Sequence, residues 1–289
     1  MIFEVEVPVF PSDVQLRRSH ILDTVTGDRV PINETARLML SLVDGRRTAK
    51  EIGEAVAVGY GLAPRRVTSD FLQLVARLNE KCLLNVKTPL RSRFVAFPRV
   101  VKLFLIDVVS GQVRPPWHRR RLHLRNETKR AGFLSVVRRL SPSAAVMGSA
   151  LSLALWLLLG DVLPSFWMVV SVALAFAVSL VIHEASHAMA LAPVPAFLSV
   201  YGPVFLVGHR VIPPKKGFIV SAAGPVITGA SGSLVVLMSG ALHSEHLVFV
   251  GEVLVMNLLG MTTLAADGRK AVRNLALAGE SPEGRSERC

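Results

Sequence analysis

The chain has 289 residues, 51% of them hydrophobic, and its 33 Lys and Arg against 21 Asp and Glu give a net charge of +12. Two cysteines, Cys82 and Cys289, exclude a disulfide framework and a cluster of thiolate metal ligands. Charged residues are dense up to about Pro142, whereas long uncharged segments dominate from there to Ala266. This uneven distribution predicts an aqueous part followed by a part that lies in a membrane.

The amino-terminal part opens with a strand pattern. Residues 21–25 and 29–32 are predicted strands, joined by a turn at Thr26-Gly27-Asp28. A further strand is expected at residues 83–86, where it could close a small sheet.

Three helices are predicted between these strands. Asn33 and Thr48 can cap the first two, because their side-chain oxygens accept hydrogen bonds from free backbone N–H groups. Pro64 suits the first position of the third helix. Residues 1–90 therefore predict an α+β, winged-helix-like domain.

Two strands and three helices of this kind often bind DNA, and the net positive charge could suggest the same. The third predicted helix, however, mixes acidic with basic residues and has no continuous basic face. We therefore expect no nucleic-acid partner.

The phrase INETARLMLSLVDGRRTAKEI, at residues 32–52, resembles the PqqD-like peptide-chaperone domain, which recognises leaders of ribosomally made, modified peptides. The resemblance covers about residues 14–87. It implies that a leader peptide binds as an extra strand beside the third helix. The alternative is a small docking domain with no peptide ligand.

Residues 91–139 are predicted to form a basic juxtamembrane linker. Within it, KLFLIDVV at residues 102–109 is expected to be a strand or a buried piece of helix. RPPWHRRRLHLR at residues 114–125 is expected to lie against anionic lipid headgroups, each basic residue contributing about 1 kcal/mol near the surface.

The remainder predicts an all-α, polytopic membrane domain at residues 140–273, with a polar tail at residues 274–289. A hydrocarbon core about 30 Å thick requires roughly twenty apolar residues in a helix. Four transmembrane helices are expected, at residues 140–160, 162–192, 217–242 and 247–266. Lys and Arg occur on alternate loops, which predicts a multi-pass protein of the cytoplasmic membrane with both termini in the cytoplasm.

Residues 193–216 separate the second and third predicted spans and contain several prolines. They are too broken for a spanning helix. We expect short extended pieces there, such as a hairpin in protein-lined space, where irregular backbone is tolerated.

The sequence SLVIHEASHAMALA, at residues 179–192, places polar groups at the end of an apolar span. His183 and His187 are four residues apart and project from one helix face. With Glu184 beside the first, they form the HExxH zinc pattern, in which the histidines bind Zn²⁺ and the glutamate takes a proton from water. The predicted topology brings Asp267 to the same depth, where it could be the third ligand.

Three motifs together resemble the site-2 protease family of intramembrane zinc metalloproteases: HEASH, then SAAGP at residues 221–225, then NLLGMTTLAADGRK at residues 257–270. The resemblance covers about residues 142–273. It implies one zinc ion bound by His183, His187 and Asp267, with Glu184 as general base. It also implies that Asn257 positions substrate or stabilises the oxyanion.

The last motif departs from the family pattern. Gly260 stands where the family usually has proline, and Ala266 replaces a leucine before Asp267. The spacing from Asn257 to Asp267 is also about two residues longer than is common, so the role of Asn257 is the weakest assignment. Glu252 interrupts the fourth predicted span, and the pattern leaves open whether it pairs within the bundle or faces the outer interface.

The two resemblances together predict an enzyme that hydrolyses a peptide bond in a membrane, acting on a precursor peptide whose leader the amino-terminal domain holds. The first alternative is proteolysis of a membrane-tethered regulator. The second is a non-catalytic peptide-binding membrane scaffold. The sequence predicts neither the scissile bond nor the oligomeric state.

Overall fold

The computed structural model describes residues 4–88, 118–159, 166–201, 204–262 and 265–279. The segment KLFLIDVV lies outside these residues. The chain divides into two compact units. The first comprises Met1–His123 and Phe197–His209, and the second comprises Leu124–Ala196 and Arg210–Cys289.

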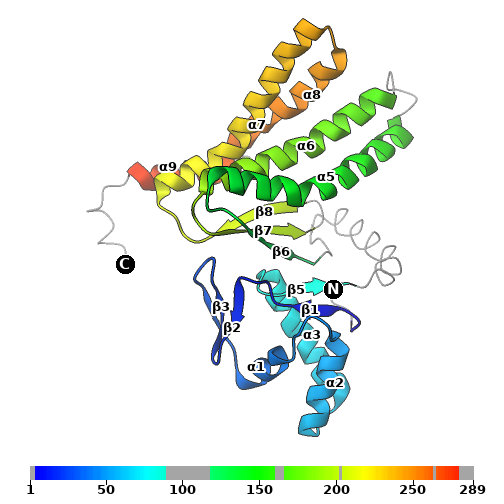
Figure 1. Ribbon diagram of the computed structural model, residues 1–289, viewed down its shortest axis with the longest axis vertical. Helices are drawn as coiled ribbons and strands as arrows, with labels where there is room; N and C mark the ends of the chain where they lie inside the picture. Colours follow the sequence, from blue (N-terminus) through cyan, green and yellow to red (C-terminus); the bar gives the residue numbers. More distant parts are fainter. Residues whose placement is uncertain (1–3, 89–117, 160–165, 202–203, 263–264, 280–289) are drawn as a thin grey trace. The chain divides into compact units, whose positions relative to one another are not determined.

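Three helices of the first unit begin where the sequence predicts (Figure 1). They are α1 (Glu34–Ser41), α2 (Ala49–Tyr60) and α3 (Pro64–Glu80). Asn33 caps α1 by accepting a hydrogen bond from the backbone N–H of Ala36 at 2.8 Å. Thr48 caps α2 in a reciprocal capping box with Glu51, and Pro64 is the first residue of α3. The predicted caps are confirmed.

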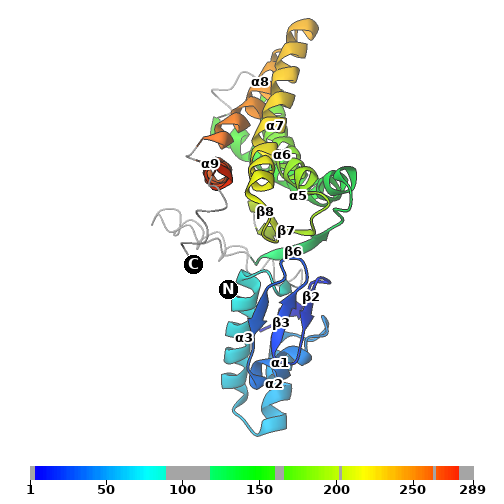
Figure 2. The ribbon, with the colours of Figure 1, turned by 90° about the vertical axis from the view of Figure 1, so that its left-hand side faces the viewer.

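The core of the first unit lies between these helices and the neighbouring strands. Figure 2 shows α1 and α3 beside the strands β2 and β3. The largest apolar side chains that are fully buried there come from strands, helices and the loop after α3: Ile21, Leu40, Ile52, Phe71, Val75 and Leu84. The predicted α/β character of this domain is therefore confirmed.

Five short strands accompany the helices: β1 (Val7–Val9), β2 (Val14–Leu16), β3 (His20–Asp23), β4 (Arg29–Pro31) and β5 (Asn85–Lys87). β2, β3 and β4 form an antiparallel sheet. β5 pairs with β1 instead, with Val9 opposite Asn85. The strand expected near residues 83–86 does form part of a small sheet, and its partner is β1, which the sequence did not predict.

A separate three-stranded sheet contains β6 (Arg120–Leu124), β7 (Ala196–Tyr201) and β8 (Val204–His209), in that order. β7 and β8 are the hairpin expected from the proline-rich segment. β6 comes from the predicted linker. Two side-chain amides join it to α3 and β5 within the first unit. Asn79 exchanges a pair of hydrogen bonds with the backbone of Arg119, and Asn85 does the same with the backbone of Arg121.

Arg121 is fully buried and lies between two acidic residues. Its guanidinium donates to Asp13 at 2.7 Å and to Asp23 at 2.5 Å, and it stacks 3.8 Å from the ring centroid of Phe197 on β7. Burial alone would raise the pKa of the Asp23 carboxyl, but the hydrogen bond and charge of Arg121, together with the backbone N–H groups of Thr26 and Val25, outweigh burial and lower the pKa. Asp23 therefore stays ionised beside the cation.

The expectation that residues 114–125 lie on lipid headgroups is wrong at Arg121. A headgroup contact requires an exposed cation, whereas Arg121 is compensated inside the protein by Asp13 and Asp23. Residues 114–117 of that segment lie outside the described residues.

The second unit is mostly helical. Its helices are α5 (Lys129–Leu159), α6 (Phe166–Leu191), α7 (Pro214–Leu242), α8 (Glu245–Val255), the 3₁₀ helix η1 (Met256–Met261) and α9 (Ala266–Gly279). α7 and α8 approach closely through two glycines. A Cβ on Gly251 would lie 2.9 Å from the carbonyl oxygen of Gly232, so a larger residue would separate the helices.

Two described helices, α6 and α7, are long and apolar enough to cross a membrane, whereas four were predicted. The first predicted span falls within α5 and is not among the two. The fourth is shorter than predicted: an apolar helix covers His246–Met261, in which α8 ends at Val255 and η1 follows. In η1 the amide of Asn257 bonds to Ser179 of α6.

We predict that Arg121→Met destabilises the first unit by about 3–5 kcal/mol, because it leaves Asp13 and Asp23 buried without a cation. Hydrogen exchange of α3 amides in the full chain would report this as faster opening. Arg120→Met is the matched control, since Arg120 is the exposed neighbour in β6, and should change the free energy by less than about 0.5 kcal/mol. Equal effects of the two variants would contradict the prediction.

Candidate metal centre

Helix α6 supplies two imidazoles on one face. His183 and His187 are one turn apart, and their Nε2 atoms lie 3.1 Å from each other. His187 Nδ1 lies 2.6 Å from the carbonyl oxygen of Val220 on α7, to which it donates a hydrogen bond. That bond fixes the tautomer and leaves Nε2 of His187 as the nitrogen that could bind an ion.

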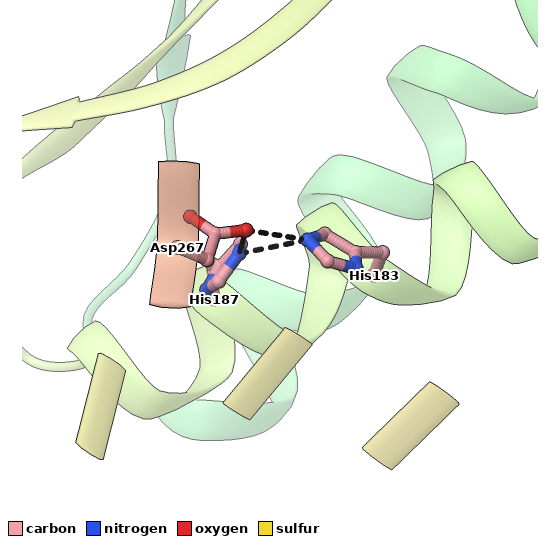
Figure 3. A group of neighbouring side chains, drawn as sticks. All are labelled: His183, His187 and Asp267. Carbon is pink, nitrogen blue, oxygen red and sulfur yellow. Dashed lines mark hydrogen bonds and ion pairs between the residues drawn. The ribbon is translucent and has the colours of Figure 1, made fainter. Parts of the chain in front are cut away.

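Asp267, in the first turn of α9, completes the group (Figure 3). Its Oδ2 atom lies 3.0 Å from His183 Nε2 and 3.4 Å from His187 Nε2. These ligand atoms all lie within 4.8 Å of one another. Two nitrogen or oxygen ligands of one tetrahedral zinc, each 2.0–2.1 Å from the ion, would be about 3.4 Å apart. The separations therefore fit three ligands of a single ion.

The charge of the group also suits a divalent cation. Burial alone would raise the pKa of the Asp267 carboxyl, but its interactions with the His183 and His187 rings together outweigh burial and lower the pKa well below its ordinary value. The carboxylate is therefore ionised at neutral pH. His183 Nδ1 is buried with no hydrogen-bond partner among the described residues, so the ring of His183 is held less firmly than that of His187.

Glu184 adjoins the first histidine but stands apart from the three ligand atoms. It is half-buried, and within the described ranges no hydrogen bond or ion pair engages its carboxylate. A carboxylate beside the ligands that is not itself occupied can accept a proton from a water molecule between them.

Gly224 on α7 makes room for the imidazoles. A Cβ at this position would lie 2.6 Å from His187 Nε2 and 2.8 Å from His183 Nε2. Only glycine therefore lets α7 approach the ligand atoms this closely. The motif SAAGP contains this residue, but its sequence alone gave no reason to place Gly224 against the histidines.

Asn257 lies away from the three ligands. Its amide donates to Ser179 Oγ at 2.7 Å and, more weakly, to the carbonyl oxygen of Val253 at 3.4 Å. Ser179 precedes His183 by one turn of α6, so Asn257 is fixed one turn from the metal ligands. Its predicted role in positioning substrate stays a prediction. Sequence reasoning missed Ser179, because a lone serine in an apolar span carries little signal.

Gly260, which replaces the family proline, packs against α7. A Cβ at Gly260 would lie 3.1 Å from Cγ of Pro225. The absent side chain therefore allows η1 to lie against Pro225, next to Gly224. This close approach is a physical reason for glycine at the position where the sequence departs from the family pattern.

We expect elemental analysis of the detergent-purified chain to find about one divalent ion, preferably zinc, per molecule. Asp267→Ala or His183→Ala should weaken zinc binding roughly 100-fold or more, because each removes one of three protein ligands. Asn257→Ala should retain the ion, since Asn257 contacts Ser179 rather than the ligands. Full zinc retention in Asp267→Ala would refute the site.

Gly224→Ala should lower zinc affinity by about tenfold or more, because the added methyl group would displace both imidazoles. Gly240→Ala is the control in the same helix, where nothing lies within 4 Å of the added atom. Competition with a chelating zinc indicator would measure both constants. If the two variants bound zinc equally well, Gly224 would have no role in shaping the site.

Comparison with known proteins bears on the amino-terminal domain. Residues 19–84 match the family model described as "Coenzyme PQQ synthesis protein D (PqqD)". No curated protein and no solved structure matches the chain. The match ends at residue 84, before the second unit begins. It supports a peptide-binding role for the amino-terminal domain in the biosynthesis of modified peptides. Residues 19–84 thus constitute a PqqD-like domain.

Proposed function

We propose that this protein is an intramembrane zinc metalloendopeptidase that processes a ribosomally synthesised precursor peptide held by its PqqD-like domain. The observation that carries the proposal is the convergence of His183, His187 and Asp267 from two helices far apart in sequence, with Glu184 beside them. The resemblance of their motifs to the site-2 protease family supports the same activity.

The residues of the site would have three separate roles in this reaction. His183, His187 and Asp267 would hold zinc, which when bound supplies a Lewis acid that polarises water and the scissile carbonyl. Glu184 accepts a proton from the attacking water and later returns it to the departing amine nitrogen. Asn257, fixed by Ser179, would contact the substrate backbone one turn away.

The proposal places the helical region in the cytoplasmic membrane with both termini in the cytoplasm. α6 and α7 have the length and apolar composition to cross it. Basic residues precede the first predicted span, separate α6 from α7, and follow Asp267, which is the distribution expected for cytoplasmic flanks. In this orientation the metal ligands lie near the cytoplasmic side of the bilayer.

Peptide capture by the PqqD-like domain would raise the concentration of the attached substrate at the zinc site. Selectivity could then reside in the leader rather than in the residues next to the cleaved bond. The outer strands of the described sheets, including β4 and β8, could each accept an extended peptide through backbone hydrogen bonds. An extended conformation is also what hydrolysis requires, because a helix keeps its carbonyls hydrogen-bonded internally.

A non-catalytic peptide-binding scaffold is the second candidate. It is favoured by the extent of the family match, which covers the peptide-binding domain alone. The two candidates differ in what they require of Glu184: proteolysis needs its carboxylate as a proton acceptor, whereas peptide binding alone does not.

Glu184→Gln separates these candidates. We expect it to lower the rate of precursor cleavage by about 10²–10⁴-fold, because the amide cannot accept a proton from water. Zinc content and leader binding should stay within about twofold, since Glu184 is not among the ligand atoms.

The measurement is co-expression of the full chain with candidate precursors, followed by mass spectrometry of the peptide products. Lys50→Gln, an exposed charge change on α2, is the control and should cleave normally. If Glu184→Gln yields the same products as the wild type, the proposed proteolysis is wrong and the scaffold is favoured.

A further inference from the structure

Glu252 is an acidic residue of α8 for which the proposed chemistry has no role. Its side chain is exposed, and among the described residues no hydrogen bond or ion pair satisfies its carboxylate. It lines a cavity of about 770 Å³, together with residues of α6, α7, α8 and η1. Apart from Glu252 and Ser233, the walls are apolar and include Val172, Leu237, Phe249 and Met256.

The packing of α8 on α7 gives the depth of this carboxylate. Gly251, the residue before Glu252, lies against the backbone of Gly232. Gly232 stands ten residues before Leu242, where α7 ends. At 1.5 Å per residue this is about 15 Å, half of a hydrocarbon core about 30 Å thick. In the proposed membrane orientation, Glu252 is therefore close to the middle of the bilayer.

A carboxylate at that depth requires compensation. Ionisable residues within membrane segments pair with one another or face a water-filled path, and they usually mark functional sites. The part of the chain that the structure describes offers Glu252 no cation. The apolar walls of the cavity favour an apolar ligand, and the carboxylate favours a positive charge on it.

We infer that this cavity binds an apolar peptide segment that carries one lysine or arginine, whose cation pairs with Glu252. This inference rests on the proposed function and specifies the substrate class: a membrane-inserted segment with a single basic residue. Met256, in the wall of the cavity, is followed in η1 by Asn257, which bonds to Ser179 one turn from His183.

The charge at Glu252 would therefore set the register of the substrate. With its basic residue paired at Glu252, the peptide would be held at a fixed place along α8, five residues before Asn257 of η1. The site would discriminate between peptides by a charge that lies away from the cleaved bond. This selection would be independent of leader recognition by the PqqD-like domain.

The test is a binding assay with the full chain carrying Glu184→Gln, in phosphatidylcholine nanodiscs. The probes are three fluorescent helical peptides of leucine and alanine, identical except for one central lysine, glutamine or glutamate. We expect the lysine peptide to bind more tightly than the glutamine peptide by roughly three- to twentyfold, the range of polar contacts between helices in membranes. The glutamate peptide should bind most weakly.

Four further variants decide the interpretation. Glu252→Gln should remove the preference for lysine, and Glu252→Lys should reverse it in favour of the glutamate peptide. Ser233→Trp, which fills the cavity, should weaken all three peptides. Glu245→Gln removes the same charge at the start of α8 and should leave the preference intact.

Persistence of the lysine preference in Glu252→Gln would overturn the inference, and so would equal binding of all three peptides to the parent chain. Because the parent cannot cleave, neither result depends on proteolysis. Failure of the zinc chemistry would instead appear in the cleavage experiment and would leave these binding ratios unchanged.

Discussion

The meeting of two imidazoles and one carboxylate is the constraint that organises the helical region. His183 and His187 can reach Asp267 only if α6 and α9 converge, and α7 must pass beside them without a side chain at Gly224. The hydrogen bond from His187 to Val220 then fixes α6 to α7 at the same level. The packing of three helices thus follows from where a few polar atoms must lie.

A second polar contact, separate from the metal ligands, lies in the last apolar segment. Asn257 reaches Ser179 from a 3₁₀ turn, and Gly260 allows that turn to press against Pro225. A regular helix through these positions would carry its side chains at different angles. This 3₁₀ turn contacts α6 through Ser179 and α7 through Pro225.

Local patterns could be predicted from the sequence, whereas distant pairings could not. The caps at Asn33 and Thr48 and the spacing of His183 and His187 depend on residues three or four apart, so their geometry follows from the helix itself. Arg121 was misplaced, because its acidic partners Asp13 and Asp23 are 108 and 98 residues away. Asp267 was proposed from topology and motif resemblance, and only the folded chain gives its distances to the histidines.

The hairpin of β7 and β8 has a consequence for how the PqqD-like domain could be exchanged. It follows α6 directly in the chain, yet Phe197 stacks on Arg121 and Ser199 meets Cys82, both within the unit that contains the PqqD-like domain. A PqqD-like domain taken from another protein would pack on this hairpin and β6 only if it carried two kinds of residue. It would need acids equivalent to Asp13 and Asp23, which pair with Arg121, and asparagines equivalent to Asn79 and Asn85, which bond to the backbone at β6.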